Sequence, residues 1–181
     1  MAGKVSAMVG EFRFWTARDL FVAHPEVALD MLASPTDEPP ADFCRALLGG
    51  RTPEDAITFC AWLLPMPATV WWAHECLSNL DELFDEPDRR LLASVGDWVG
   101  AGGNGPPLLE AMAKPDQRTP AVWIALATAR SVELPAPRAV NAGILAGLAR
   151  VALEDRHDVL TAFVEMGLQL AGSEALQRSD A

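Results

Sequence analysis

Proline and glycine interrupt this chain at short intervals, and this punctuation constrains the fold more than any other feature. Examples are the prolines at 39–40, the glycines at 49–50 and the glycine-rich stretch at 100–107. The segments between them, rich in Ala, Leu, Val and Glu, are about 10–16 residues long, which is typical of helices in globular proteins. Alternation of apolar and polar residues is confined to EFRFW at 11–15, a short strand or an extended arm.

Helix starts are marked by residues that cap a first turn. Thr16 is followed three residues later by Asp19, a variant capping box, and Thr52 and Thr119 each precede a proline. The expected helices are 16–24, 26–33, 40–48, 53–64, 67–80, 87–100, 107–113, 120–131, 137–153 and 157–171. The sequence therefore predicts an all-α fold, a single domain of about eight to ten helices packed as consecutive helical hairpins.

The domain organisation follows from the same pattern. We expect an N-terminal arm at 1–15, a helical domain at 16–172 with a weak subdivision near 100–106, and a flexible polar tail at 173–181. The first ten residues lack the continuous apolar region of a secretory signal. The longest apolar stretch, 139–153, is too short to span a bilayer. We expect a cytoplasmic protein without membrane insertion.

Acidic residues dominate the charge. Asp and Glu outnumber Lys and Arg by 25 to 14, which gives a net charge of −11. Residues 1–90 carry 15 acids against 7 bases, so the excess is concentrated in the first half. Such a chain repels phosphate backbones, which argues against nucleic-acid binding and favours a partner with a basic surface.

The three cysteines, Cys44, Cys60 and Cys76, form an odd set without a CxxC pair. Neither a disulfide framework nor a zinc site is indicated. Each lies among apolar residues, so we expect buried, reduced thiols. No cofactor motif accompanies them.

Two adjacent tryptophans stand in PATVWWAHECL, at 67–77. A helix turns by about 100° per residue, so the two cannot share a face. One face gathers an apolar core stripe: Val70, Ala73, Cys76, Leu77 and Leu80. Trp72 borders this stripe and is expected in the core. Trp71 points to the other side, followed at i+3, i+4 and i+7 by a polar set: His74, Glu75 and Ser78.

This second stripe leaves two alternatives for Trp71. The helix is either buried on both sides, with Trp71 in a second core contact, or Trp71 is an anchor for a partner. A zinc site is not indicated, because Ser78 stands where an HExxH motif needs its second histidine. Trp62 is a further interface candidate, since it too lies outside an obvious core stripe.

The segment DELFDEPDRR, at 81–90, is the most acidic stretch and lacks the spacing of a calcium-binding loop. It is either a solvated loop that starts the next helix or an electrostatic docking patch. The exposed candidates in it are Asp81, Glu82, Asp85 and Glu86. The glycines at 100–107 follow a helix rather than a strand, so they indicate a flexible helix–helix loop and not a phosphate cradle.

Two later helices carry packing signals. Ala139, Gly143 and Gly147 recur every four residues, a spacing that lets a neighbouring helix approach closely. The helix at 120–131 is apolar nearly all round and is expected to be the central buried one.

Several blocks of the chain resemble an uncharacterised family of bacterial helical proteins. They include PTDEPPADFCRALL at 35–48, TPEDAITFCAWLLPMPATVWWAHECL at 52–77, PAPRAVNAGILAGLARV at 135–151 and LTAFVEMGLQLA at 160–171. The tandem tryptophans after a Leu-Leu-Pro turn are the most specific mark. The resemblance implies a gene often located near type VI secretion genes. It assigns no catalytic residue.

Three functional hypotheses follow. The first is a non-enzymatic interaction factor, an adaptor, chaperone-like or accessory protein, whose partner is a secretion-system component or an effector with a basic surface. The second is an immunity protein that neutralises a toxin. The third is an enzyme whose site is assembled from distant residues.

Overall fold

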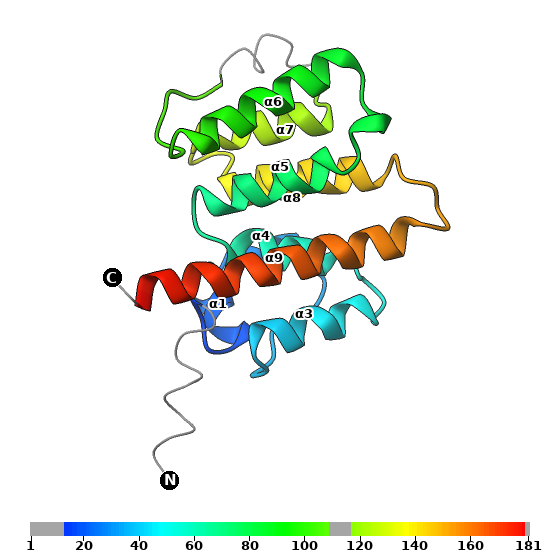
Figure 1. Ribbon diagram of the computed structural model, residues 1–181. Helices are drawn as coiled ribbons and strands as arrows, with labels where there is room; N and C mark the ends of the chain where they lie inside the picture. The colour runs from blue at the N-terminus through cyan, green and yellow to red at the C-terminus, as the bar shows by residue number, and fades with distance from the viewer. Residues whose placement is uncertain (1–12, 109–116, 180–181) are drawn as a thin grey trace. The chain divides into compact units, whose positions relative to one another are not determined.

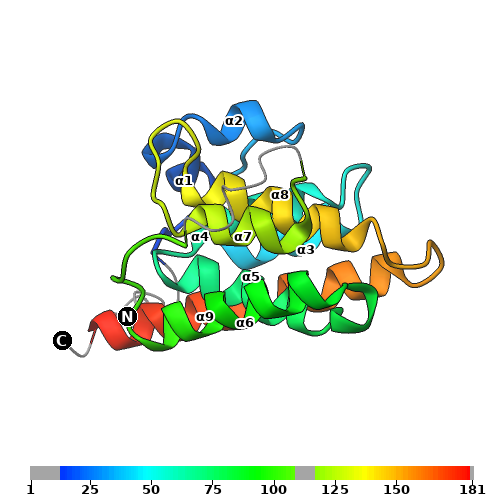
Figure 2. The same cartoon turned by 90° about the horizontal axis from the view of Figure 1, so that it is seen from above.

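The computed structural model describes residues 13–108 and 117–179. These ranges contain nine α-helices and no strand, so the predicted all-α class is confirmed (Figures 1 and 2). None of the helices in them combines the length and the apolar character that crossing a membrane requires. The chain divides into two compact units: unit 1 comprises Met1–Leu64 with Val164–Ala181, and unit 2 comprises Pro65–Phe163.

Unit 1 holds the first four helices and the later part of the last one: α1 (Ala17–Ala23), α2 (Val27–Asp30), α3 (Pro40–Leu48), α4 (Asp55–Leu63) and α9 (Arg156–Ser179) from Val164 onward. Unit 2 holds α5 (Ala68–Ser78), the 3-10 turn η2 (Asp81–Leu83), α6 (Glu86–Gly100), α7 (Pro120–Ala127), α8 (Ala136–Leu148) and the start of α9.

Three sequence expectations are refined by these bounds. The last helix does not end at residue 171 but continues to Ser179. The expected helix at 107–113 lies mostly outside the described residues, as does the beginning of EFRFW, whose last three residues form no strand. The N-terminal arm, the subdivision near 100–106 and the flexible tail stay predictions.

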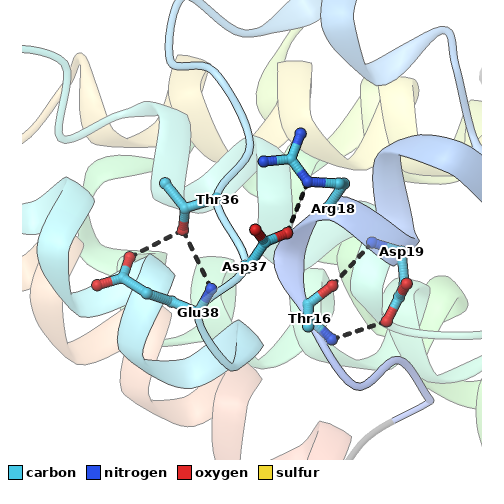
Figure 3. A network of polar contacts seen from close by, with 6 residues as sticks. All are labelled: Thr16, Arg18, Asp19, Thr36, Asp37 and Glu38. Atoms are coloured by element: carbon cyan, nitrogen blue, oxygen red, sulfur yellow. Dashed lines mark hydrogen bonds and ion pairs between the residues drawn. The ribbon is translucent and has the colours of Figure 1, made fainter.

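The start of α1 shows the predicted capping box (Figure 3). The Thr16 hydroxyl accepts a hydrogen bond from the Asp19 backbone N–H at 3.2 Å, and the Asp19 carboxylate accepts one from the Thr16 N–H at 2.9 Å. In the same view, Arg18 Nε donates to Asp37 Oδ1 at 2.6 Å. Because this ion pair is exposed, it contributes little to stability, while the reciprocal cap satisfies two backbone donors.

The predicted cap of the fourth helix is wrong in detail. The helix begins at Asp55 and not at Pro53, because the backbone first makes a tight turn in which the Asp55 N–H donates to the Thr52 carbonyl at 3.0 Å. The Asp55 carboxylate is buried and accepts from the Thr52 hydroxyl and from the N–H groups of Leu32 and Ala33. A first-turn acid thus fastens the chain after α2 to α4.

The expectation that 120–131 is the central buried helix is corrected as well. All nine residues of α4 are buried, whereas α7 keeps Val122, Trp123 and Leu126 partly exposed. The sequence DAITFCAWL is apolar all round except for Asp55 and Thr58, so α4 has no face that favours water.

The cysteines are buried and free, as expected. Cys44 of α3 and Cys60 of α4 are in contact, with their Sγ atoms 3.8 Å apart. Burial raises the pKa of the Cys44 thiol well above its ordinary value, so the thiol stays protonated and acts as a small apolar side chain.

The predicted close approach of helices is confirmed in unit 2. A Cβ at Gly143 of α8 would lie 2.4 Å from Ile124 Cδ1 of α7 and 3.1 Å from the Pro120 carbonyl oxygen. A Cβ at Gly147 would lie 2.6 Å from Leu77 Cδ2 of α5. Both positions are buried, so α8 packs against α7 and α5 through its glycine stripe.

We expect Gly143→Ala to lower the free energy of unfolding by about 1–2 kcal/mol, because the new methyl group overpacks the contact with Ile124. Gly100→Ala is the matched control: a Cβ there meets nothing within 4 Å, and the change should be neutral or raise stability by about 0.5–1 kcal/mol through helix propensity. Urea denaturation measures both. Equal effects of the two changes would contradict the close-approach interpretation.

His24 lies in unit 1 between two aromatic rings, with centroid distances of 6.1 Å to Phe14 and 5.2 Å to Trp62. Burial, followed by the positive charge of Arg13, lowers the pKa of His24 from its ordinary value of 6.5, and Glu26 opposes this effect. The imidazole is therefore harder to protonate in the folded chain than in the unfolded one.

The consequence is a specific loss of stability in acid. As pH falls below 6.5, the unfolded chain takes up a proton at His24 before the folded chain does, so the free energy of unfolding decreases. In His24→Gln this part of the decrease should be absent. Unfolding of both proteins measured between pH 7.5 and 5 tests the prediction, and parallel curves would contradict it.

Candidate functional site

Helix α5 organises the candidate site by presenting two different faces. Its predicted core stripe is buried: Val70, Ala73, Cys76 and Leu77 are fully inaccessible, and Leu80 just beyond the helix is 8% exposed. Trp72 is also fully buried, and its indole N–H donates to the Phe163 carbonyl at 2.9 Å. The core assignment of Trp72 is therefore confirmed, and the bond fixes how α5 is rotated about its axis.

The opposite face of α5 carries Trp71, which is 37% exposed. Its ring stacks on the imidazole of His74, with centroids 5.2 Å apart and planes inclined by 19°. His74 Nδ1 lies 3.1 Å from Glu75 Oε1, within hydrogen-bond distance. The structure thus brings three of the four predicted stripe residues into one connected group at the surface.

Helix α6 supplies the surface on which this group rests. A Cβ at Gly96 would lie only 2.7 Å from His74 Nε2, so the missing side chain makes room for the imidazole. Arg89, Leu92 and Ala93 precede Gly96 at i−7, i−4 and i−3 on the same helix face. The stripe on α5 and this stripe on α6 therefore lie against each other.

Between the two stripes is an open hollow of about 200 Å³, here called the α5–α6 hollow. It is lined by His74 and Ser78 from α5, Asp81 from η2, and Arg89, Leu92 and Ala93 from α6. Leu92 is only 3% exposed and forms an apolar floor. The hollow therefore combines an apolar base with a small number of polar groups, in a volume below the roughly 300–1,000 Å³ of small-molecule sites.

The charged groups of the hollow differ in the hydrogen bonds and ion pairs that they form. Arg89 Nε donates to the Asp81 backbone carbonyl at 3.0 Å, and its Nη1 lies 3.8 Å from Glu86 Oε2. In the described part of the chain, the Asp81 carboxylate and the Ser78 hydroxyl form no hydrogen bond or ion pair. Among the described residues, the hollow thus holds an arginine with two polar contacts and a carboxylate with none.

The order Glu75, His74, Ser78 superficially suggests a carboxylate–imidazole–hydroxyl relay. Such a relay needs a hydrogen bond from the hydroxyl to the second imidazole nitrogen. Among residues 13–108 and 117–179, no such bond joins Ser78 to His74, and His74 Nε2 faces the backbone at Gly96. The same ranges contain no group of three or more His, Cys, Asp or Glu residues that could hold a metal ion.

The residues of the acidic segment 81–90 have different structural roles. Asp85 is the N-cap of α6 and accepts from the Asp88 N–H at 2.9 Å. Glu86 forms exposed ion pairs with Arg89 and Arg90. Glu82 is exposed, lies in η2 and does not line the hollow. Asp85 and Glu86 therefore start the next helix, and the docking role of the segment stays a prediction.

Asp88 was not among the candidate residues, and it is the one acid of this segment that is buried. It accepts a hydrogen bond from the Thr119 hydroxyl at 2.6 Å and lies 4.0 Å from Arg150 Nη1. Thr119 is also the predicted N-cap of α7 and is confirmed as such, because its hydroxyl accepts from the Val122 N–H. This contact joins the starts of α6 and α7.

Trp62, the remaining candidate, belongs to α4 of unit 1 and is 4% exposed. Its ring packs against His24. Trp62 is therefore a buried side chain, in keeping with the all-round apolar character of α4.

The sequence interpretation missed the contribution of α6. A glycine inside a helix costs about 1 kcal/mol relative to alanine, so Gly96 was a signal of a close approach. The i, i+3, i+4, i+7 relation of Arg89, Leu92, Ala93 and Gly96 was also visible. What no local pattern contained was that this face of α6 lies against the Trp71 face of α5.

In a comparison with protein families, residues 43–171 match a family of unknown function (DUF6931). The match covers more than half of the chain, so the chain belongs to this family. It includes α5, η2 and α6, and therefore every residue of the α5–α6 hollow. Neither the curated proteins nor the solved structures contain a match.

We expect Gly96→Ala to displace the His74 imidazole, because the new methyl group would lie only 2.7 Å from Nε2. The change should alter the stacking on Trp71 and shift the signal of its indole N–H in a two-dimensional NMR spectrum. Gly100→Ala, on the same helix with open space around it, should leave that signal in place. An unchanged indole signal in Gly96→Ala would contradict the packing described here.

Proposed function

We propose that this member of the DUF6931 family is a non-enzymatic protein-interaction factor that binds its partner through Trp71 and the α5–α6 hollow. The observation that carries the proposal is the position of Trp71, which is 37% exposed and stacked on His74, a residue that lines the hollow. The residues that line the hollow are suited to recognition: they are few, chemically varied and held on two packed helices.

An exposed tryptophan beside a hollow is a recurrent feature of protein interfaces. Tryptophan is enriched among the residues whose truncation weakens binding most, since it buries a large apolar area at low entropic cost. Stacking on His74 restricts the orientation of the indole before a partner arrives. This restriction reduces the entropy that binding must remove.

The expected partner carries a basic surface. The net charge of the chain is −11. Asp81, which lines the hollow, is exposed, as are Glu82 and Asp85 in the same acidic segment. Such a field accelerates the approach of a positively charged protein and disfavours nucleic acids. The family resemblance noted in the sequence suggests a component or effector of a type VI secretion system as that partner, with the chain acting as an adaptor or accessory factor.

The proposal is tested by affinity capture from the native host with tagged wild type and Trp71→Ala, followed by mass spectrometry. We expect the wild type to capture one abundant partner. The Kd of that partner for the wild type should be about 30-fold lower than its Kd for Trp71→Ala, as is typical of an interface tryptophan. Trp15→Ala is the matched control, because Trp15 is 58% exposed and belongs to unit 1. It should bind like the wild type.

Two results would contradict the proposal. One is the absence of any partner that distinguishes wild type from Trp71→Ala. The other is an equal loss of binding in Trp15→Ala, which would indicate unspecific adhesion of exposed aromatic rings. Circular dichroism of each variant checks folding, and Trp71→Leu replaces Trp71→Ala should the smaller side chain destabilise α5.

A further inference from the structure

We propose that the α5–α6 hollow receives a lysine or arginine side chain of the partner, with Asp81 as the residue that binds the positive end. This inference rests on the proposed function, since it specifies the chemistry of the group that the partner contributes. It follows from the charges, the apolar floor and the aromatic rim of the hollow taken together.

The charge of the hollow favours a cation. Asp81 is exposed and its carboxylate is uncompensated, and the nearby Ser78 hydroxyl can accept a further hydrogen bond. Arg89 offsets one negative charge of this surface, but Glu75 and Glu82 add two further carboxylates on α5 and η2. An incoming ammonium or guanidinium group thus meets an available acceptor on one side of the hollow.

The remaining lining matches the rest of a basic side chain. Leu92 and Ala93 form an apolar base, on which the methylene stem of lysine or arginine can lie while its charged end reaches the polar groups. The imidazole of His74 supplies the aromatic part of the lining, and Trp71 lies outside the lining and stacks on it. The faces of aromatic rings attract cations, and a guanidinium group can also stack on them.

An acidic side chain fits the same hollow poorly. Its carboxylate would meet the uncompensated charge of Asp81, with Glu75 and Glu82 near by on α5 and η2. Arg89, which shares the Glu86 carboxylate with Arg90, offsets one of these three negative charges. The electrostatic balance therefore selects between the two signs of charge.

The test is a titration of the purified chain with the tripeptide acetyl-Gly-Arg-Gly-amide and its lysine counterpart, monitored by NMR. The signal of the Trp71 indole N–H, assigned by its disappearance in Trp71→Phe, should shift in a saturable way with both peptides. Acetyl-Gly-Glu-Gly-amide should cause no saturable shift. Loss of the charge-assisted bond in Asp81→Asn should weaken binding of the basic peptides about tenfold.

Glu82→Gln is the matched control, because it removes the same charge one residue away and outside the lining of the hollow. It should leave the affinity of the arginine peptide within about a factor of two. Equal weakening by both variants would overturn the inference in favour of a diffuse acidic field. Absence of saturable binding by the basic peptides, or binding of the glutamate peptide instead, would overturn it directly.

The outcome is separable from that of the proposed function. If Trp71→Ala loses the partner but Asp81→Asn retains it, the proposed interaction function stands. The inference that a basic side chain of the partner binds at Asp81 is then refuted. If the arginine peptide binds in a saturable way but no partner is captured, the hollow remains a cation-binding site. The proposed protein-interaction function is then refuted. Ser78→Ala serves as a second variant, with weaker peptide binding expected and no change in folding.

Discussion

The close approach of α8 to two other helices is the constraint on which unit 2 depends. At Gly143 the neighbour is Ile124 of α7, and at Gly147 it is Leu77 of α5. A methyl group at either glycine would collide with these side chains. The glycines therefore allow α8 to pack closer to α7 and α5 than larger residues would. Leu77 thereby lies in a fully buried position, and the side of α5 that faces α8 is determined by packing density as well as by hydrophobicity.

Once α5 is held in this way, the position of its other face follows. The bond from the Trp72 indole to the Phe163 carbonyl, 2.9 Å long, prevents the helix from turning the adjacent tryptophan inward. Trp71 is then left partly exposed, and the ring of His74 on which it stacks fits against Gly96 of α6. The α5–α6 hollow is thus a product of two glycine contacts, one on each side of α5. Its chemistry is decided by the residues that remain: one paired arginine, one unpaired carboxylate and an apolar floor.

The sequence predicted local features where the physical cause is local. The reciprocal bonds of Thr16 and Asp19 and the N-cap at Thr119 form within one helical turn, and both are observed. The core stripe of α5 follows from the helical period, and all its members are buried. Predictions failed where a distant contact decided the outcome. The carboxylate of Asp55 accepts hydrogen bonds from the backbone N–H groups of Leu32 and Ala33. The helix that is buried on every side is α4 and not the helix at 120–131.

The sequence alone thus determined the all-α class, the helix starts whose caps lie within four residues, and the placement of Trp71 and Trp72 on different faces of one helix. These depend on backbone geometry and on a period of 3.6 residues, which act over a few positions. Only the tertiary structure decided that Trp71 stacks on His74 and that α6 supplies half of the hollow. It also decided that Arg89 has polar contacts while the Asp81 carboxylate has none among the described residues. Those facts depend on which helix faces lie against each other, and this is set by side-chain volumes that are far apart along the chain.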